Sequence, residues 1–85
     1  MKDKICKRTT RKITDDIEEE YELRVENGAY TILCTEYNKK KNETAYEKAE
    51  SITKSKRFAK RLYRLLVKNK ACIGTINDII SDQMC

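Results

Sequence analysis

The chain has 85 residues, of which 39% are charged and 39% are hydrophobic, and its formal net charge is +5. A chain of this length forms one domain with a small core. It has no apolar run near the roughly 20 residues that a membrane helix needs, and the basic stretch from Met1 to Ile13 lacks the apolar core of a signal peptide. These features argue against a membrane protein and predict a small, basic, cytoplasmic domain.

Residue types that carry catalysis or hold metals are scarce. There is no histidine, and the four cysteines lie far apart in the sequence without a Cys-x-x-Cys pair. Zinc sites and nucleophilic centres usually need such pairings, so we expect no metal, no cofactor, no small-molecule ligand and no enzymatic activity. Cys34 is expected in the core, and reduced thiols are expected throughout.

The first 18 residues are strongly charged. Basic residues run from Lys2 to Lys12, and acidic residues follow from Asp15 to Glu20. The residues between Ile5 and Ile13 suit a strand, but their small apolar surface is also typical of a mobile arm. Residues 1–18 are therefore an arm or an edge strand, and residues 19–85 form the α+β domain.

The next segment predicts a β-hairpin. Apolar and polar residues alternate up to Glu26, and Asn27-Gly28 suits the positive φ angles of a two-residue turn. A two-residue turn places three apolar pairs on one face: Val25 with Tyr30, Leu23 with Ile32, and Tyr21 with Cys34. The other face is expected to be exposed to solvent. Its carboxylates Glu20 and Glu22 lack an evident basic partner or pocket, which argues against a catalytic pair.

The stretch from Thr44 to Ile52 is ambiguous. Its glutamate and alanine content favours a helix, whereas the preceding hairpin needs another strand beside it. We predict a strand with Tyr46 and Ile52 facing inward, after a polar loop over residues 38–43.

Two amphipathic helices follow. Thr53 is the expected N-cap of a long helix over residues 54–70, which has four to five turns and an apolar face around Leu62 and Leu66. A short C-terminal helix carries Ile76, Ile79 and Ile80 on one face. Together, the elements predict an α+β fold, in which an antiparallel sheet of three to four strands is packed by one long and one short helix.

From about Tyr21 to Gln83 the chain resembles a small bacterial family, the domain-of-unknown-function family 6514. The resemblance rests on Gly28-Ala29-Tyr30-Thr31-Ile32, on Ser51-Ile52-Thr53-Lys54-Ser55-Lys56, and on Leu65-Leu66-Val67-Lys68-Asn69-Lys70-Ala71 with Asn77-Asp78-Ile79-Ile80 after it. It implies a similar sheet-plus-helix fold and a strand at residues 44–52, and it implies no activity.

The chain departs from the family near the short helix. Ile73 and Gly74 stand where the family has a proline, and Thr75 stands where it often has a histidine. The start of the short helix is therefore expected to slip toward Thr75, and no role of that histidine transfers to this chain.

A face of the long helix is the candidate functional surface. No acid interrupts the basic residues between positions 54 and 70, and six of them project away from the apolar face: Lys56, Arg57, Lys60, Arg61, Arg64 and Lys68. Such a face is either a solvated surface, a polyanion-binding surface, or a surface that docks an acidic partner or the chain's own acidic stretch.

The leading hypothesis is a non-enzymatic interaction or regulatory module that binds another protein, or its own copy as a homodimer. The alternative is a nucleic-acid-binding accessory protein that uses the basic face of helix 54–70. Reversing Lys60, Arg61 and Arg64 to glutamate separates a nucleic-acid binder from a hydrophobic dimer.

Overall fold

The protein is a four-stranded antiparallel sheet with two helices on one face, and the computed structural model describes residues 4–69 and 74–84. The strands follow one another in the order β1-β2-β3-β4. The elements are β1 Lys4–Lys12, β2 Ile17–Glu26, β3 Ala29–Asn38, β4 Glu43–Thr53, α1 Lys56–Lys68 and α2 Ile76–Met84. The predicted α+β class is confirmed.

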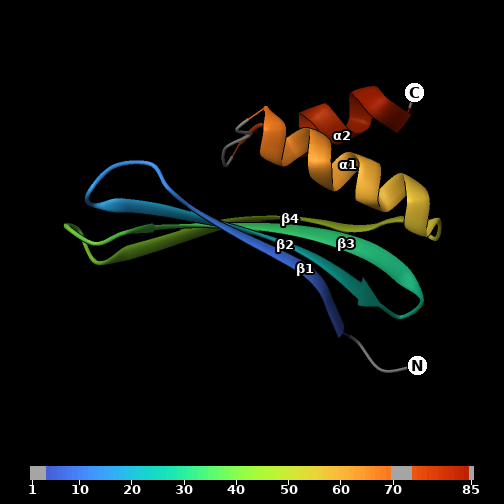
Figure 1. The fold of residues 1–85 in the computed structure, drawn as a ribbon, viewed down its shortest axis with the longest axis horizontal. Coiled ribbons are helices and arrows are strands. Elements are labelled where there is room, and N and C mark those ends of the chain that lie inside the picture. The colour runs from blue at the N-terminus through green and yellow to red at the C-terminus, as the bar shows by residue number, and fades with distance from the viewer. Residues whose placement is uncertain (1–3, 70–73, 85) are drawn as a thin grey trace.

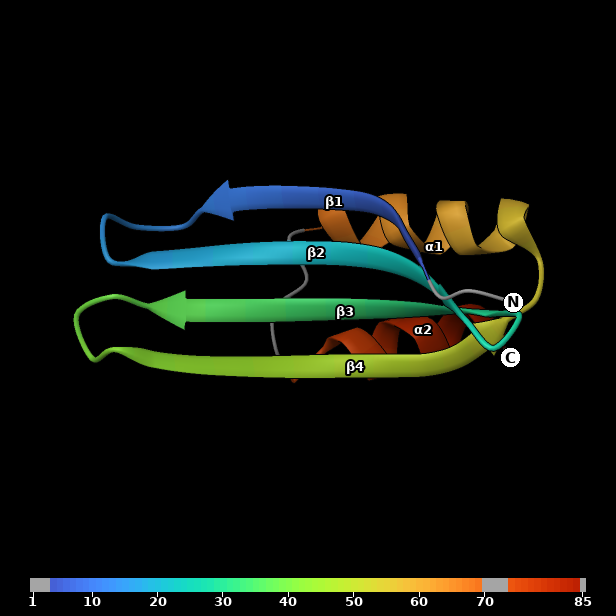
Figure 2. The ribbon, with the colours of Figure 1, turned by 90° about the horizontal axis from the view of Figure 1, so that it is seen from below.

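Both helices cover the same face of the sheet, and no described residue forms a helix on the other face (Figure 1). α1 lies behind the β1 and β2 side of the sheet, and α2 lies behind β3 and β4 (Figure 2). The sheet extends beyond the helices at the end that carries the turns over residues 13–16 and 39–42. The helix layer therefore places α1 close to the β1 edge.

The β2–β3 hairpin has the predicted register. Val25 pairs with Tyr30, Leu23 with Ile32, and Tyr21 with Cys34. The turn places Asn27 at φ 53° and Gly28 at φ 81°, the left-handed region that Asn and Gly tolerate best. Turn chemistry and side-chain alternation thus specify the same pairing.

Residues 4–12 form an edge strand rather than a mobile arm. β1 pairs antiparallel with β2, so that Thr9 lies opposite Tyr21 and Arg11 lies opposite Glu19. The register shifts between Ile5 and Lys7, which is the geometry of a β-bulge. Basic β1 therefore lies beside acidic β2, and opposite charges face one another across the pair.

The predicted strand at residues 44–52 is confirmed as β4, but its predicted facing is wrong at Tyr46. Tyr46 is 68% exposed, whereas Ala49 and Ile52 are buried. The register with β3 shifts in this part of β4, and Ser51 there has φ 50° and donates its N–H to Thr31 Oγ1. The bulge breaks the alternation, so Tyr46 and Ile52 cannot share a face.

α1 has 13 residues and is shorter than predicted, since it begins at Lys56 and ends at Lys68. The predicted cap at Thr53 is also wrong, because Thr53 is the last residue of β4. Ser55 is the N-cap, and its side chain accepts a hydrogen bond from the backbone N–H of Phe58. Lys70 lies outside the described residues.

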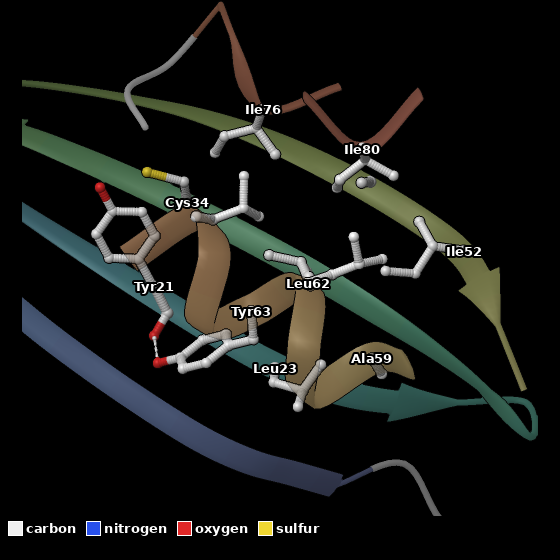
Figure 3. Close-up of a cluster of buried hydrophobic side chains, with 12 residues drawn as sticks. Tyr21, Leu23, Cys34, Ile52, Ala59, Leu62, Tyr63, Ile76 and Ile80 are labelled. Atoms are coloured by element: carbon white, nitrogen blue, oxygen red, sulfur yellow. Dashed lines mark hydrogen bonds between the residues drawn. The ribbon is translucent and has the colours of Figure 1, made fainter. Parts of the chain in front are cut away.

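The core lies between the sheet and the two helices (Figure 3). Cys34 is fully buried as predicted, and Ile76 and Ile80 of α2 pack into the same cluster. The buried apolar residues are Tyr21, Leu23, Ile32, Cys34, Ala49, Ile52, Ala59, Leu62, Tyr63, Leu66, Ile76 and Ile80.

Candidate functional site

A hydrogen bond and the apolar core hold α1 against the first two strands. Tyr63 is buried, and its hydroxyl oxygen lies 2.5 Å from Thr9 Oγ1 of β1. The same oxygen lies 3.2 Å from the carbonyl oxygen of Tyr21 (Figure 3). Burial raises the pKa of the Tyr63 hydroxyl although the hydrogen bond with Thr9 opposes this, so the hydroxyl stays protonated near neutral pH. The contact fixes the lateral position of α1 beside β1.

A groove runs between β1 and α1, and basic side chains line both walls. One part has a volume of about 700 Å³ and a floor that includes Tyr63 and Val67. A second part, of about 290 Å³, includes Val25 and Tyr30, and Lys7 lines both parts. We call this surface the basic groove, and its cations are Lys4, Lys7 and Arg8 of β1 with Lys56, Lys60, Arg64 and Lys68 of α1.

The helical cations of the basic groove form a regular stripe. Lys56, Lys60, Arg64 and Lys68 are four residues apart in α1, so they lie on one side of the helix. The stripe spans about 18 Å, given a rise of roughly 1.5 Å per residue. Neither wall includes an acidic residue among the residues that line the groove.

The structure divides the six cations of the predicted helix face. Four of them line the basic groove, whereas Arg57 and Arg61 are exposed outside it. Sequence reasoning missed the β1 wall with Lys4, Lys7 and Arg8. The basic composition of residues 4–12 was the available signal, but it does not say which helix lies beside that strand.

The acidic stretch of the chain pairs with β1 and with the β3–β4 turn. Glu19 Oε1 lies 2.7 Å from Arg11 Nη2, and Glu18 Oε1 lies 2.8 Å from Lys39 Nζ. Across the described residues, no ion pair joins a cation of α1 to an acid. Docking of the acidic stretch onto this helix within one molecule is therefore wrong.

Glu20 and Glu22 have basic partners, contrary to the expectation from sequence. Arg8 Nη2 lies 3.3 Å from Glu22, and Arg24 Nη2 lies 2.6 Å from Glu22. A hydrogen bond between the two carboxyl groups raises the pKa of Glu20. Burial alone would raise the pKa of Glu22, but the hydrogen bonds with Glu20 and Arg24 and the charges of Arg24 and Arg8 lower it. These contacts form an ion-pair network on the helix-free face of the sheet.

A buried polar cluster lies below the C-terminal end of α1. Arg11 Nη2 donates to Glu19 Oε1 at 2.7 Å and to the Tyr21 hydroxyl at 2.9 Å, and Arg11 Nη1 donates to the Val67 carbonyl at 3.4 Å. Burial alone would lower the pKa of Arg11, but the hydrogen bond and charge of Glu19 raise it. Arg11 thus ties β1 to β2 and to the last turn of α1.

Glu47 of β4 holds the start of α2. Its carboxylate accepts hydrogen bonds from the backbone N–H groups of Gly74, Ile76 and Asn77 and, at 2.7 Å, from Asn77 Nδ2. Burial alone would raise the pKa of Glu47, but these donors lower it. A carboxylate at a helix N-terminus also matches the helix dipole.

In the parts of the chain that the structure describes, no group of three or more cysteine, aspartate and glutamate side chains could hold a metal ion. Cys6 is a half-buried free thiol and Cys34 is buried in the core, while Cys72 and Cys85 lie outside the described residues.

Of the helices that the structure describes, neither α1 nor α2 is long and apolar enough to cross a membrane.

Comparison with known proteins gives one match. The chain matches the Family of unknown function (DUF6514) over residues 1–85. No curated protein and no solved structure matches it. Because the match covers the whole chain, the protein belongs to the family of unknown function DUF6514.

Proposed function

We propose that the protein is a non-enzymatic binding module that recognises an acidic partner protein through the basic groove. One observation carries this proposal: two elements without a single acid supply the two walls of the groove. Of the cations that line the groove, three belong to β1 and four belong to α1. Such a concentration of one sign of charge attracts and orients an oppositely charged partner.

The groove also offers apolar surface, which favours a polypeptide ligand. Tyr63 and Val67 contribute to its larger part, and Val25 and Tyr30 contribute to its smaller part. Protein interfaces combine apolar contacts at the centre with charged groups at the rim. An acidic segment with some apolar side chains satisfies both parts of the groove.

The β1 edge does not favour a homodimer. Two copies that meet through β1 bring Lys4, Lys7 and Lys12 of one chain against the same cations of the other, and like charges across a strand pair are destabilising. We therefore place the partner in a different, acidic protein.

A nucleic acid is the second candidate ligand. The stripe of cations in α1 has no acidic partner among the described residues and is long enough to follow several phosphates. Against this candidate, the apolar surface of Tyr63 and Val67 in the groove has no counterpart in a phosphate backbone.

Fluorescence anisotropy tests the proposal with three labelled probes, an oligoglutamate peptide, a mixed-sequence RNA and a mixed-sequence DNA, at low and physiological salt. The variant Lys60→Glu/Arg64→Glu changes the groove, and Arg57→Glu/Arg61→Glu is its control with the same charge change on the same helix. We expect the groove variant to weaken peptide binding at least tenfold and the control to weaken it less than threefold.

Two outcomes contradict the proposal. Equal losses in both variants show that net charge, rather than the groove, attracts the probe. Tighter binding of nucleic acid than of peptide at physiological salt, with the loss confined to the groove variant, favours the second candidate.

A further inference from the structure

β1 is an edge strand, and among the residues that the structure describes one side of its backbone has no partner strand. In an edge strand, every second residue directs its N–H and C=O outward, and these groups can pair with an added strand. β1 carries two features that oppose uncontrolled pairing: its lysines, and the bulge between Ile5 and Lys7. An acidic added strand meets the lysines as favourable partners.

The β1 edge also lies beside a helix. Extended peptides that add to a sheet edge obtain affinity from main-chain hydrogen bonds and specificity from pockets for alternate side chains. The basic groove supplies such side-chain contacts, because α1 flanks β1 along Lys7 and Thr9. The two elements thus offer a backbone template and a side-chain surface together.

The spacing of the charges fits an extended acidic segment. Successive cations of the α1 stripe are separated by about 6 Å along the helix axis, and alternate side chains of a strand are separated by about 6.8 Å. The stripe of about 18 Å corresponds to roughly six residues of extended chain. Acidic residues at every second position therefore match the spacing of the cations.

The chain contains its own example of this recognition. β2 pairs with the other side of β1, and its acids lie opposite β1 cations. Arg11 binds Glu19 at 2.7 Å, and Arg8 binds Glu20 at 3.4 Å. A basic strand that already selects one acidic strand presents similar chemistry at its free edge.

We propose that the basic groove takes an extended acidic segment of a partner protein, which adds to the sheet as a fifth strand beside β1. Its acidic side chains, at alternate positions, face Lys7, Arg64 and Lys68. This inference rests on the proposed function and adds the conformation, the length and the charge pattern of the ligand.

The probe is a labelled synthetic peptide with the sequence of residues 17–23 of this chain, Ile-Glu-Glu-Glu-Tyr-Glu-Leu. Two derivatives carry backbone N-methyl groups, one at its even-numbered positions and one at its odd-numbered positions. An added strand directs only alternate N–H groups toward β1. We expect one derivative to bind at least tenfold more weakly than the parent and the other to bind within threefold of it.

The protein variants locate the bound peptide. Arg64→Glu/Lys68→Glu is expected to weaken parent binding at least tenfold, and the control Arg57→Glu/Arg61→Glu less than threefold. Circular dichroism confirms that each variant remains folded, and Arg64→Gln/Lys68→Gln repeats the test with neutral side chains if the reversal disturbs folding.

Each contrary result has a distinct meaning. If both derivatives bind like the parent, and the groove variant still weakens them, strand addition is wrong and the proposed function remains. If the parent peptide fails to bind at low salt, both proposals are wrong. If the groove and control variants lose peptide affinity equally, the peptide binds outside the basic groove and the proposal is wrong. If the protein alone shows concentration-dependent sedimentation, the β1 edge binds a second copy of the chain instead of an acidic partner.

Discussion

Glu19 is a carboxylate with 2% exposure on the face of the sheet that also carries Tyr21. A buried charge is tolerated only when it is paired and hydrogen-bonded, and Arg11 supplies the charge while the Tyr21 hydroxyl donates a further hydrogen bond at 3.2 Å. Burial is the main factor that raises the pKa of Tyr21, so this hydroxyl remains a donor. The cluster is therefore a unit whose members depend on one another.

The dependence within this cluster can be measured. Arg11→Leu leaves Glu19 buried without its cation, and we expect a loss of about 3 kcal/mol in the free energy of unfolding. The double variant Arg11→Leu/Glu19→Leu is expected to recover much of this loss, because no charge remains buried. Urea denaturation gives both values, with exposed Lys12→Leu as the control on the same strand. Equal losses in the single and double variants contradict the pairing.

At the scale of elements, the features predicted correctly from sequence are those that residues close together in the chain determine. The Asn27-Gly28 turn and the alternation around it determine the β2–β3 register residue by residue. The prediction that Tyr46 faces inward was wrong, because the alternation of apolar and polar residues in the sequence does not reveal the β-bulge at Ser51. The cap moved from Thr53 to Ser55 because pairing with Tyr30 holds Thr53 in β4.

The junction between β4 and α2 depends on a contact distant in sequence. Glu47 accepts the N–H groups at the start of α2, so Glu47→Gln is expected to lower the free energy of unfolding by about 1 kcal/mol at neutral pH. The folded-state pKa of Glu47 lies below its unfolded-state value. Its contribution is therefore present above about pH 4.3 and is lost as the pH falls through the folded-state pKa.

Urea denaturation of both proteins between pH 7 and pH 2.5 checks this prediction. The difference between wild type and Glu47→Gln should shrink toward acid pH, whereas the control Glu50→Gln, at an exposed position of the same strand, should show a small difference throughout. If the difference in the free energy of unfolding stays constant with pH, the charge of Glu47 does not stabilise the start of α2.

At the scale of the whole molecule, charge is distributed unevenly around the sheet. β1 and α1, which lie next to each other near one edge of the sheet, carry cations without acids. α2 lies on the same face of the sheet, over β3 and β4, and carries Asp78 and Asp82. The sequence could identify the cations of α1 because helical spacing is local. It could not place β1 beside them, because contacts such as that of Tyr63 with Thr9 join residues distant in the chain.

The most direct test of the basic groove is a ¹H–¹⁵N NMR titration of the labelled protein with the peptide of residues 17–23. We predict that the amide signals that shift most belong to β1 and the groove side of α1, around Lys7, Thr9, Arg64 and Lys68, and that β1 amides gain protection from hydrogen exchange. Shifts confined to β4, α2 or the helix-free face of the sheet, or none at saturating peptide, would contradict the account.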